Sequence, residues 1–508
     1  MTVTTEADAS TASSAHAPAH AHAPAHTPAS APAPAPAPAS ASAAQPPAAE
    51  AVDALVADLA AALDADRVLR DPESLARYSH DDAEWAPFEA PLAVALARST
   101  DEVSAVLRLA AASGVRVVPR GAGTGLSGGA NAVANCVVLS LELMDAITEI
   151  DVDERYAVVQ PGVINDALRA AVAEHGLWYP PDPASSAIST IGGNVATNAG
   201  GICCVKYGVT RDYVLGLTVV LADGSVVELG RRTAKGVAGY DLVGLMVGSE
   251  GTLGVVTSVT VRLLPLAGRD ERAVIGYFPS LVAAGDAVAA ISRAGIIPAA
   301  LEILDRTCLR AVDDWVHLGL PSDVDTLLLA RVDERGAAGD ELADQVATVF
   351  AEAGGTDVEL ATDPAEIDRL FQARRLAYPA LERLGPVLTE DICVPRSAVP
   401  EMLRRIQATA ASADVVIANI AHAGDGNLHP LIIAPEGDEA AKARAKTAFD
   451  AIVADCLDLG GTVTGEHGVG LLKLPGLRAE LGDRVLAMHR SVKDALDPSG
   501  TLNPGKAF

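Results

Sequence analysis

The sequence has 508 residues, half of them hydrophobic, and a formal net charge of −28. So negative a chain is poorly suited to nucleic acid or an anionic membrane surface, because both attract positive charge. No apolar run reaches the roughly 18 residues that cross a bilayer. Six scattered cysteines without a CxxC pair are typical of a reduced cytoplasmic protein, not of a disulfide scaffold or an iron–sulfur site. The length suggests two or three domains.

Residues 1–49 consist mainly of Ala, Pro, Ser, His and Thr, with an Ala-Pro run at 31–38. Such a segment buries too little apolar area to offset the entropy lost on ordering, so we predict a disordered tail. The absence of Lys and Arg argues against a secretory signal or a transit peptide. Loose metal chelation is the alternative role for the four histidines of the tail, His16, His20, His22 and His26.

Helical spacing of apolar residues predicts a helix over 51–64. A second helix is predicted from Thr100, as its N-cap, to Gly114. A short strand at 115–118 then leads into the loop PRGAGTGLSGG at 119–129. Backbone N–H groups in such a turn form an anion site, but the third glycine is misplaced for GxGxxG and the P-loop lysine is missing. The loop indicates a pyrophosphate cradle of another type, and a glycine-rich hairpin explains it nearly as well.

The stretch 181–201, PDPASSAISTIGGNVATNAGG, combines hydroxyl and amide side chains with four glycines. It is a poor core segment and a poor regular helix. We interpret it as a wall against a large, polar, ring-bearing ligand, and a Gly/Ser-rich surface loop is the alternative. A third glycine-punctuated segment, GSEGTLGVV at 248–256, leads into a strand that ends at Pro265. Three such loops in one αβ region indicate one extended ligand.

From about residue 270, glycine clusters become rarer and charges more frequent, which indicates a second domain over 270–458. Near its end, and just beyond it, two motifs concentrate histidine: HAGDGNLHP and GEHG. Two imidazoles and a carboxylate with an open position are typical of a catalytic divalent metal site. The residues that provide this set are His422, His429 and Glu466, and ordinary hydrogen-bonded histidines are the alternative interpretation.

The three glycine loops, together with HAGDGNLHP, TGEHGVG and the terminal DPSGTLNPGK, resemble flavoproteins of the vanillyl-alcohol-oxidase (PCMH) type. Within that family the resemblance is to the D-2-hydroxy-acid dehydrogenase branch, and it covers about 65–508. It implies an α+β fold with a FAD-binding domain of two αβ subdomains (50–268), a cap domain with an antiparallel sheet (269–458) and a C-terminal segment that completes the active site (459–508). Because 119–130 contains no His or Cys to bond the flavin, we expect non-covalent FAD.

The resemblance also assigns residues to the reaction. It implies that His422, His429 and Glu466 bind a divalent metal, zinc or manganese, and that His467 takes the hydroxyl proton, a task that suits imidazole. Arg374 and Asn427 are implied as substrate contacts, and the planar fork of Arg374 would grip a carboxylate. The implied FAD contacts are Pro119, Arg120, Gly121, Ala122, Gly123, Thr124, Gly125, Ser127, Gly128, Pro183, Ser185, Ser186, Thr190, Gly192, Gly193, Asn194, Asn198, Gly200, Gly201, Glu250, Gly251, Gly254, Val256 and Asn503.

Three local expectations accompany these assignments. If residues 465–468 are extended, Glu466 and His467 point to opposite sides, one toward the metal and one toward the flavin. Arg374 and the adjacent Arg375 are also consistent with a surface helix. Relatives that oxidise a dicarboxylate carry a lysine where Thr389 stands here, and the acidic pair after Thr389 disfavours a second substrate carboxylate.

We therefore expect oxidation of a small D-2-hydroxy acid, D-lactate or glycolate, with D-2-hydroxyglutarate as the alternative substrate. Two rivals from other classes are a flavin-free metal hydrolase and a non-catalytic flavin-binding subunit. The chain has no iron–sulfur or haem motif, so electrons must leave to oxygen, a quinone, a cytochrome or a partner subunit. A cytoplasmic location is expected, with contact to a membrane only through a partner.

Overall fold

The computed structural model describes residues 49–508 except 234, 267–269 and 322–323. All of these described residues belong to one unit, Pro47–Phe508. Residues 1–48 of the predicted tail, with their four histidines, lie outside the described residues. The predicted α+β class is confirmed, because the chain contains both mixed and antiparallel sheets with helices packed against them.

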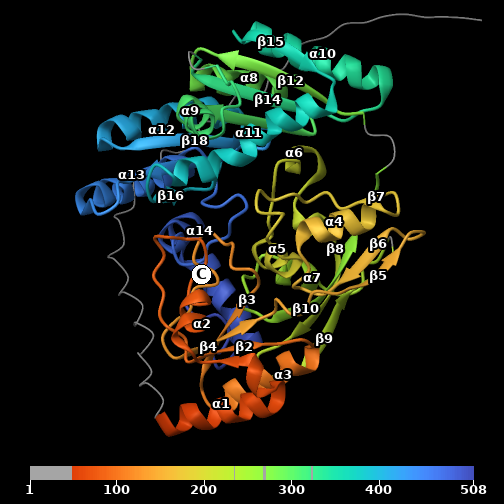
Figure 1. The fold of residues 1–508 in the computed structure, drawn as a ribbon, viewed down its shortest axis with the longest axis vertical. Coiled ribbons are helices and arrows are strands. Elements are labelled where there is room, and N and C mark those ends of the chain that lie inside the picture. Colours follow the sequence, from red (N-terminus) through yellow and green to blue (C-terminus); the bar gives the residue numbers. More distant parts are fainter. Residues whose placement is uncertain (1–48, 234, 267–269, 322–323) are drawn as a thin grey trace, which may run out of the picture. The chain divides into compact units, whose positions relative to one another are not determined.

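The first sheet has four strands in the order β1-β2-β4-β3, of which β2, β4 and β3 are parallel. Two amphipathic helices pack on it (Figure 1). Together they bury leucine and valine side chains in one apolar cluster with the sheet, or pack them against it. Ser99, not the expected Thr100, caps the second of these helices, because its hydroxyl accepts the Glu102 N–H at 3.3 Å. The elements are α1 (Ala49–Leu63), β1 (Val68–Leu69), α2 (Pro72–Arg77), β2 (Ala93–Leu96), α3 (Thr100–Ala112), β3 (Arg116–Arg120) and β4 (Cys136–Ser140).

The second sheet has five antiparallel strands in the order β5-β6-β10-β8-β9. A turn at 223–224 joins β8 to β9. A short helix, α5, lies within the stretch that was expected to be a poor helix: the Thr190 hydroxyl caps it and Asn198 ends it at φ 56°. The elements are β5 (Ile147–Asp151), β6 (Tyr156–Val159), α4 (Asn165–Ala173), β7 (Leu177–Trp178), α5 (Ile191–Thr197), α6 (Cys204–Tyr207), β8 (Val214–Val220), β9 (Val226–Gly230), α7 (Leu242–Met246), β10 (Val255–Arg262) and β11 (Leu264–Pro265).

The third sheet is an eight-stranded antiparallel sheet in the order β15-β12-β14-β13-β18-β19-β16, with β17 paired to β19. Its strands are β12 (Arg272–Phe278), β13 (Ala300–Asp305), β14 (Thr326–Val332), β15 (Thr356–Ala361), β16 (Val387–Thr389), β17 (Ile392–Cys393), β18 (Val416–His422) and β19 (Asn427–Ile433). The surrounding helices are α8 (Leu281–Arg293), α9 (Arg306–Val316), α10 (Gly336–Glu352), α11 (Pro364–Glu382), α12 (Val399–Ala413) and α13 (Glu439–Asp458).

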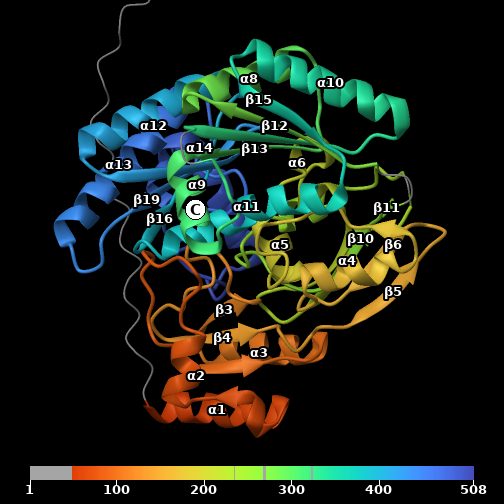
Figure 2. The ribbon, with the colours of Figure 1, turned by 45° about the horizontal axis from the view of Figure 1, so that its top comes forward.

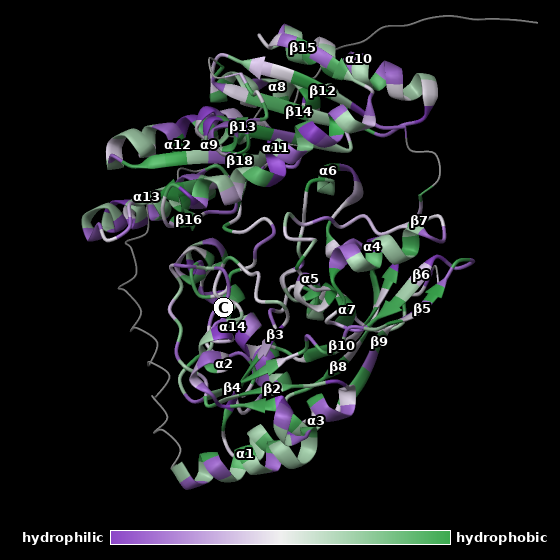
Figure 3. Ribbon diagram, in the orientation of Figure 1, coloured by the Kyte–Doolittle hydropathy of each residue, from purple (hydrophilic) through white to green (hydrophobic). Residues whose placement is uncertain are grey.

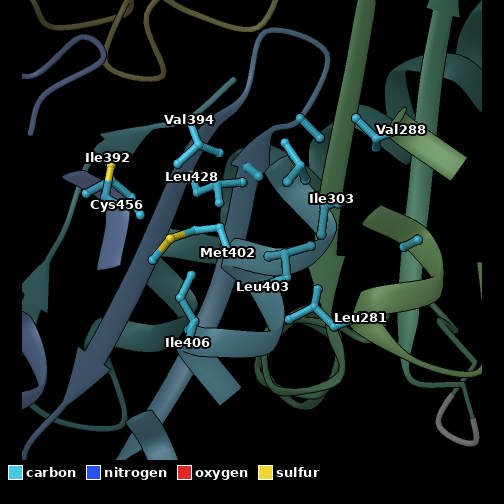
Figure 4. Packing of buried hydrophobic residues seen from close by; sticks show 14 of the residues in the cluster. Leu281, Val288, Ile303, Ile392, Val394, Met402, Leu403, Ile406, Leu428 and Cys456 are labelled. Atoms are coloured by element: carbon cyan, nitrogen blue, oxygen red, sulfur yellow. The ribbon is translucent and has the colours of Figure 1, made fainter. Parts of the chain in front are cut away.

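Helices cover both faces of this sheet. Side chains from α8, α10, α12 and α13 share one apolar cluster, and those from α9 and α11 share another. Figure 4 shows Met402, Leu403 and Ile406 of α12 in the first cluster, near Ile303 and Leu428 of the strands. In Figure 2, α12 and α13 lie side by side. Figure 3 shows hydrophobic and hydrophilic residues alternating along α10 and α13, as expected of helices with one buried face.

The last residues of the chain return to the first sheet. The helix α14 (Leu474–Leu496) is kinked at Gly482, where φ is 69°. The terminal segment then forms a parallel bridge between Leu502 and Val117 of β3. Lys506 is buried and donates to the carbonyl of Asn131 and to the side chain of Asn503. The C-terminus therefore holds the glycine loop that follows β3.

Candidate active site

All three glycine loops line one cavity of about 450 Å³. The cavity also receives side chains from α11, β18, β19 and the segment after Gly465. The predicted cofactor residues that line it are Pro119, Arg120, Gly121, Ala122, Gly123, Thr124, Gly125, Ser127, Pro183, Ser185, Thr190, Gly192, Gly193, Asn194, Gly200, Glu250, Gly251, Gly254 and Val256. Those that the structure does not place on its wall are Gly128, Ser186, Asn198, Gly201 and Asn503.

The cavity wall requires glycine and offers unsatisfied polar groups. A Cβ on Gly121 would lie 2.5 Å from the Thr190 hydroxyl, so a side chain there would separate the first two loops. The Ser189 hydroxyl and the Asn194 amide nitrogen are buried at the wall and make no hydrogen bond to any residue that the structure describes. Because buried polar groups are normally hydrogen-bonded, these atoms fit a long polar cofactor such as FAD.

Two residues join the glycine loops to the C-terminal part of the chain. Glu250 is buried with φ 52°, and its carboxylate accepts the backbone N–H groups of Val469 and Gly470 at 2.7 and 2.8 Å. Burial raises the pKa of Glu250. The Asn503 amide donates to the carbonyls of Gly129 and Glu250 at 2.9 and 2.7 Å. Asn503 therefore supports the loops from behind the cavity wall.

The structure brings the three predicted metal ligands together at one end of the cavity. In the β18–β19 hairpin, Ile420 pairs with His429 and His422 pairs with Asn427, so strand alternation places both imidazoles on one face. Glu466 approaches from another segment, with its Oε1 3.2 Å from His422 Nε2 and 3.3 Å from His429 Nε2. One ligand atom from each of the three residues lies within 4.8 Å of the others.

The electrostatics of this cluster favour a cation. The fully buried Glu302 carboxylate lies 2.9 Å from His422 Nδ1, on the opposite side of the ring from Glu466. Burial alone would lower the pKa of His422, but Glu302 and Glu466 raise it well above its usual value. A site where the buried Glu302 and the half-buried Glu466 flank one imidazole, with a second imidazole beside it, has the donor set of a divalent metal centre.

His467 lies beside this cluster, and its position corrects one expectation. Its ring stacks on His429 with 5.0 Å between centroids and 14° between planes. Its Nε2 lies 3.7 Å from Glu466 Oε1, and both residues line the same cavity. The expectation that Glu466 and His467 point to opposite sides is therefore wrong, because the segment turns here instead of running extended. Burial lowers the pKa of His467 to about 4, which keeps its imidazole neutral at pH 7.

Arg374 is a buried residue of α11 and not a surface arginine. It lines the cavity, and its Nε donates to Glu302 Oε2 at 2.6 Å. Its terminal nitrogens make no hydrogen bond within the described part of the chain. The neighbouring Arg375 also lines the cavity but pairs with the exposed Asp368 at 2.8 Å.

Two further expectations differ from the structure. Asn427 is not on the cavity wall, and its amide donates to Asp391 at 2.8 Å, so it contacts protein where substrate was expected. Of the run Thr389, Glu390 and Asp391, only Thr389 lines the cavity. The other two carboxylates are fully buried behind the wall and face protein, so they cannot act directly on a second substrate carboxylate.

Sequence reasoning missed several wall residues. Tyr378 and Glu382 follow Arg374 at four-residue intervals on α11, so the helical period was the signal that places them on the same stripe. Asp81 and Asp82 come from the loop after α2, and no local pattern marks them. The position of Asp391 behind the wall, where it accepts from Asn427, was also not predicted, since it depends on contacts between distant segments.

Comparisons with known proteins agree with this geometry. Residues 91–230 match the family described as "FAD binding domain", and residues 269–507 match "FAD linked oxidases, C-terminal domain". Glycolate oxidase subunit GlcD of Bacillus subtilis is 42% identical over 419 residues, which cover 82% of this chain and 89% of that protein. GlcD of Escherichia coli strain K12 is 41% identical, covering 84% and 87% of the two chains. A D-lactate dehydrogenase of Anaerostipes hadrus is 34% identical, covering 87% and 94%.

The chain belongs to the FAD-linked oxidase family. The resemblance inferred from the sequence motifs is thereby confirmed, and the chain is an FAD-linked oxidoreductase. The fold of this protein also matches 4-ethylphenol oxidase from Gulosibacter chungangensis, with a TM-score of 0.75 at 18% identity, covering 90% of this chain and 97% of that one. No helix among the described residues has the length and apolar character needed to cross a membrane.

Proposed function

We propose that this oxidase converts a small D-2-hydroxy acid, D-lactate or glycolate, to the 2-oxo acid with non-covalent FAD and a divalent metal, zinc or manganese. One observation carries the proposal: His422, His429, Glu466, His467 and Arg374 line the same cavity as the three glycine loops. A metal donor set, a neutral base and a carboxylate-binding cation thus face the proposed flavin site. The names of the relatives, glycolate oxidase subunit and D-lactate dehydrogenase, support the same substrate class.

Two bound groups would supply chemistry that side chains lack. FAD, held by the glycine loops, would provide the acceptor for the hydride that leaves C2 of the substrate. A divalent ion, held by His422, His429 and Glu466, would act as a Lewis acid toward the substrate hydroxyl. The remaining tasks are to bind the carboxylate, to orient C2 and to remove a proton, and these belong to the protein.

Arg374 and His467 are proposed to perform these tasks. The Arg374 guanidinium is fixed at Nε by Glu302, which leaves its two terminal nitrogens for the two oxygens of a carboxylate. The His467 imidazole is neutral at physiological pH because burial lowers its pKa to about 4. It can therefore accept the hydroxyl proton of the substrate as C2 is oxidised.

The cavity wall supports a substrate with a short, uncharged tail. Next to Arg374 along α11, the wall continues with Tyr378 and then Glu382, and Asp82 lines the same cavity. A second carboxylate would enter a wall that already carries negative side chains, which disfavours D-2-hydroxyglutarate. Glu390 and Asp391 are buried behind the wall and do not contribute to this preference.

The rival functions explain less of the molecule. A flavin-free metal hydrolase uses the histidines but leaves the three glycine loops and the buried unsatisfied groups at Ser189 and Asn194 without a purpose. A non-catalytic flavin-binding subunit leaves His467 and Arg374 unexplained. Because two relatives are named as subunits, we propose that electrons leave this oxidase through a partner subunit, in the cytoplasm or at a membrane that the partner contacts.

Anaerobic flavin reduction tests the proposal. The purified protein, loaded with zinc or manganese, is mixed with D- and L-lactate, glycolate and D-2-hydroxyglutarate while the flavin absorbance is followed. We expect bleaching by D-lactate or glycolate, little by L-lactate, and none after chelation, with the flavin absorbance itself retained. A colourless protein would support the hydrolase, and a yellow protein that no hydroxy acid bleaches would support the non-catalytic subunit.

A further inference from the structure

Asp391 is a hub that connects the candidate metal centre to the rest of the protein. Its side chain is fully buried and does not line the cavity. The Oδ2 atom lies 3.1 Å from the buried Lys473 Nζ, which balances its charge. Its carboxylate also accepts hydrogen bonds from a side-chain hydroxyl, a side-chain amide and three consecutive backbone N–H groups, from Thr464 (2.7 Å), Asn427 (2.8 Å), Gly465 (3.1 Å), Glu466 (3.1 Å) and His467 (2.9 Å).

The two stacked imidazoles have the same orientation relative to Asp391. The Nδ1 atoms of His429 and His467 face this carboxylate, at 3.6 Å from Oδ1 and 3.9 Å from Oδ2. Their Nε2 atoms face Glu466 Oε1 instead, at 3.3 and 3.7 Å. Both Nδ1 atoms are buried and make no hydrogen bond to any residue in the described ranges. The nearest anionic group for both Nδ1 positions is therefore the same carboxylate.

We propose that Asp391 is a positioning residue that selects the Nδ1–H tautomer of both His429 and His467 and holds the Gly465–His467 turn at the metal centre. The inference rests on the proposed function. A carboxylate facing a ring nitrogen favours a proton there, because N–H is attracted to negative charge and a lone pair is repelled. Glu466 faces both Nε2 atoms in the same way, so the selection by Asp391 applies once a metal cation occupies the ligand set and balances the Glu466 charge. The Nε2 lone pair of His429 is then available for the metal, and that of His467 for the substrate proton.

One carboxylate thus selects the tautomer of two imidazoles and fixes the position of the turn that carries Glu466. Its three backbone hydrogen bonds place Glu466, the only carboxylate among the three proposed ligands. The adjacent Glu390 offers a comparison, because its side chain is equally buried. The Glu390 carboxyl accepts one hydrogen bond from a described residue, which the backbone N–H of Asp391 donates at 3.3 Å. Burial of a carboxyl at this point of the chain is therefore not sufficient to produce such a set of hydrogen bonds. The contacts with the imidazoles and the turn are specific to Asp391.

Asp391→Asn and Glu390→Gln form a matched pair of tests. Asparagine has one acceptor oxygen and presents an N–H group that favours the opposite imidazole tautomer. With FAD-bound, metal-stripped protein and zinc chloride as the probe, we expect Asp391→Asn to weaken zinc binding about 10- to 100-fold by calorimetry. At saturating zinc, kcat for D-lactate should fall by about 10²-fold or more, while FAD remains bound. Glu390→Gln should leave both quantities within about twofold.

A second measurement applies to the wild-type enzyme and does not depend on a foldable variant. Long-range ¹H–¹⁵N spectra of the zinc-loaded protein, with labelled histidine, report which ring nitrogen carries the proton. We expect Nδ1–H for His429 and His467, assigned by His429→Asn and His467→Asn. Protonation at Nε2 in either ring would overturn the proposal.

The outcomes separate this inference from the proposed function. If the wild type binds zinc and D-lactate reduces its flavin, but Asp391→Asn behaves like Glu390→Gln, the role of Asp391 is rejected and the proposed function stands. If the wild type binds no zinc and no hydroxy acid reduces its flavin, both are rejected.

Discussion

Arg374 and Glu302 form a buried ion pair in which Arg374 Nε lies 2.6 Å from Glu302 Oε2. The other oxygen of Glu302 lies 2.9 Å from His422 Nδ1. A residue of β13 thereby orients a proposed substrate-binding arginine on α11 and a proposed metal ligand on β18. The proposed carboxylate-binding residue and one proposed metal ligand are therefore linked through one side chain.

Removal of the Glu302 charge should destabilise the protein and weaken both binding functions. Glu302→Gln leaves Arg374 without a buried counter-charge, which costs about 3–5 kcal/mol of folding free energy. Urea unfolding of the FAD-bound protein measures the loss. Glu401 is an exposed carboxylate that pairs with Arg404 and Arg405, so Glu401→Gln is the control and should change stability little. Equal stability of the two variants would contradict the linkage.

Arg374→Lys should affect substrate binding far more than the cofactor. Lysine keeps the charge but loses the planar fork, and each charge-assisted hydrogen bond is worth about 1.5–3 kcal/mol. The KM for D-lactate should rise about tenfold or more for each 1.4 kcal/mol lost. Steady-state kinetics with an artificial electron acceptor give the value. Arg375→Lys is the matched control, because Arg375 lines the same cavity but pairs with Asp368. A KM within twofold of wild type for Arg374→Lys would place the clamp elsewhere.

His467→Ala should abolish proton removal and leave the bound groups in place. We expect kcat to fall by about 10²–10⁴, with unchanged flavin absorbance and zinc still bound. Rapid-mixing measurement of flavin reduction isolates the step. His489 is an exposed histidine on α14 whose ring contacts Phe508, so His489→Ala should reduce flavin at the wild-type rate. Normal reduction by His467→Ala would assign the base to another residue.

The loss of activity at acid pH should occur below the pH range in which an ordinary histidine side chain titrates. A general base works in its neutral form, so activity is lost as the pH falls through its pKa. Burial lowers the pKa of His467 to about 4, and a divalent ion nearby would lower it further, because a positive charge disfavours imidazolium. We therefore expect kcat/KM for flavin reduction to hold from neutral pH down to about pH 5 and to decline below that. A midpoint near the ordinary value for histidine would contradict the buried environment.

The flavin should leave the protein without chemical cleavage. The loop over 119–130 contains no histidine or cysteine that could bond it. Acid precipitation should release all yellow colour into the supernatant, where thin-layer chromatography identifies FAD. Colour that remains with the precipitate would show a covalent link from a residue outside this loop.

The cofactor region could be predicted from the sequence because its backbone geometry requires particular residue types at particular positions. A backbone that closely approaches another segment needs glycine, as at Gly121, where a Cβ would meet Thr190. This requirement for glycine appears in the sequence as short glycine-rich patterns. The three glycine loops predicted from these patterns line one cavity. The spacing of His422 and His429 across a glycine-rich turn likewise reflects a β-hairpin, whose register places both rings on one face. In each case the sequence signal is a pattern of residues a few positions apart, even where the contact that it serves lies between distant segments.

The surroundings of the proposed metal centre were decided only by the tertiary structure. Glu302 meets Arg374 and His422 across 72 and 120 residues, and Asp391 meets His467 across 76. No local sequence pattern links these residues. They come together in space because of the strand order in the sheet and because the C-terminal segment returns to the site. For the same reason the sequence assigned Asn427 to the substrate and His467 to the side opposite Glu466, whereas the turn bound by Asp391 places Glu466 and His467 together. Sequence pattern thus identified many of the side chains that line the cavity, and long-range packing determined which way they face and what surrounds them.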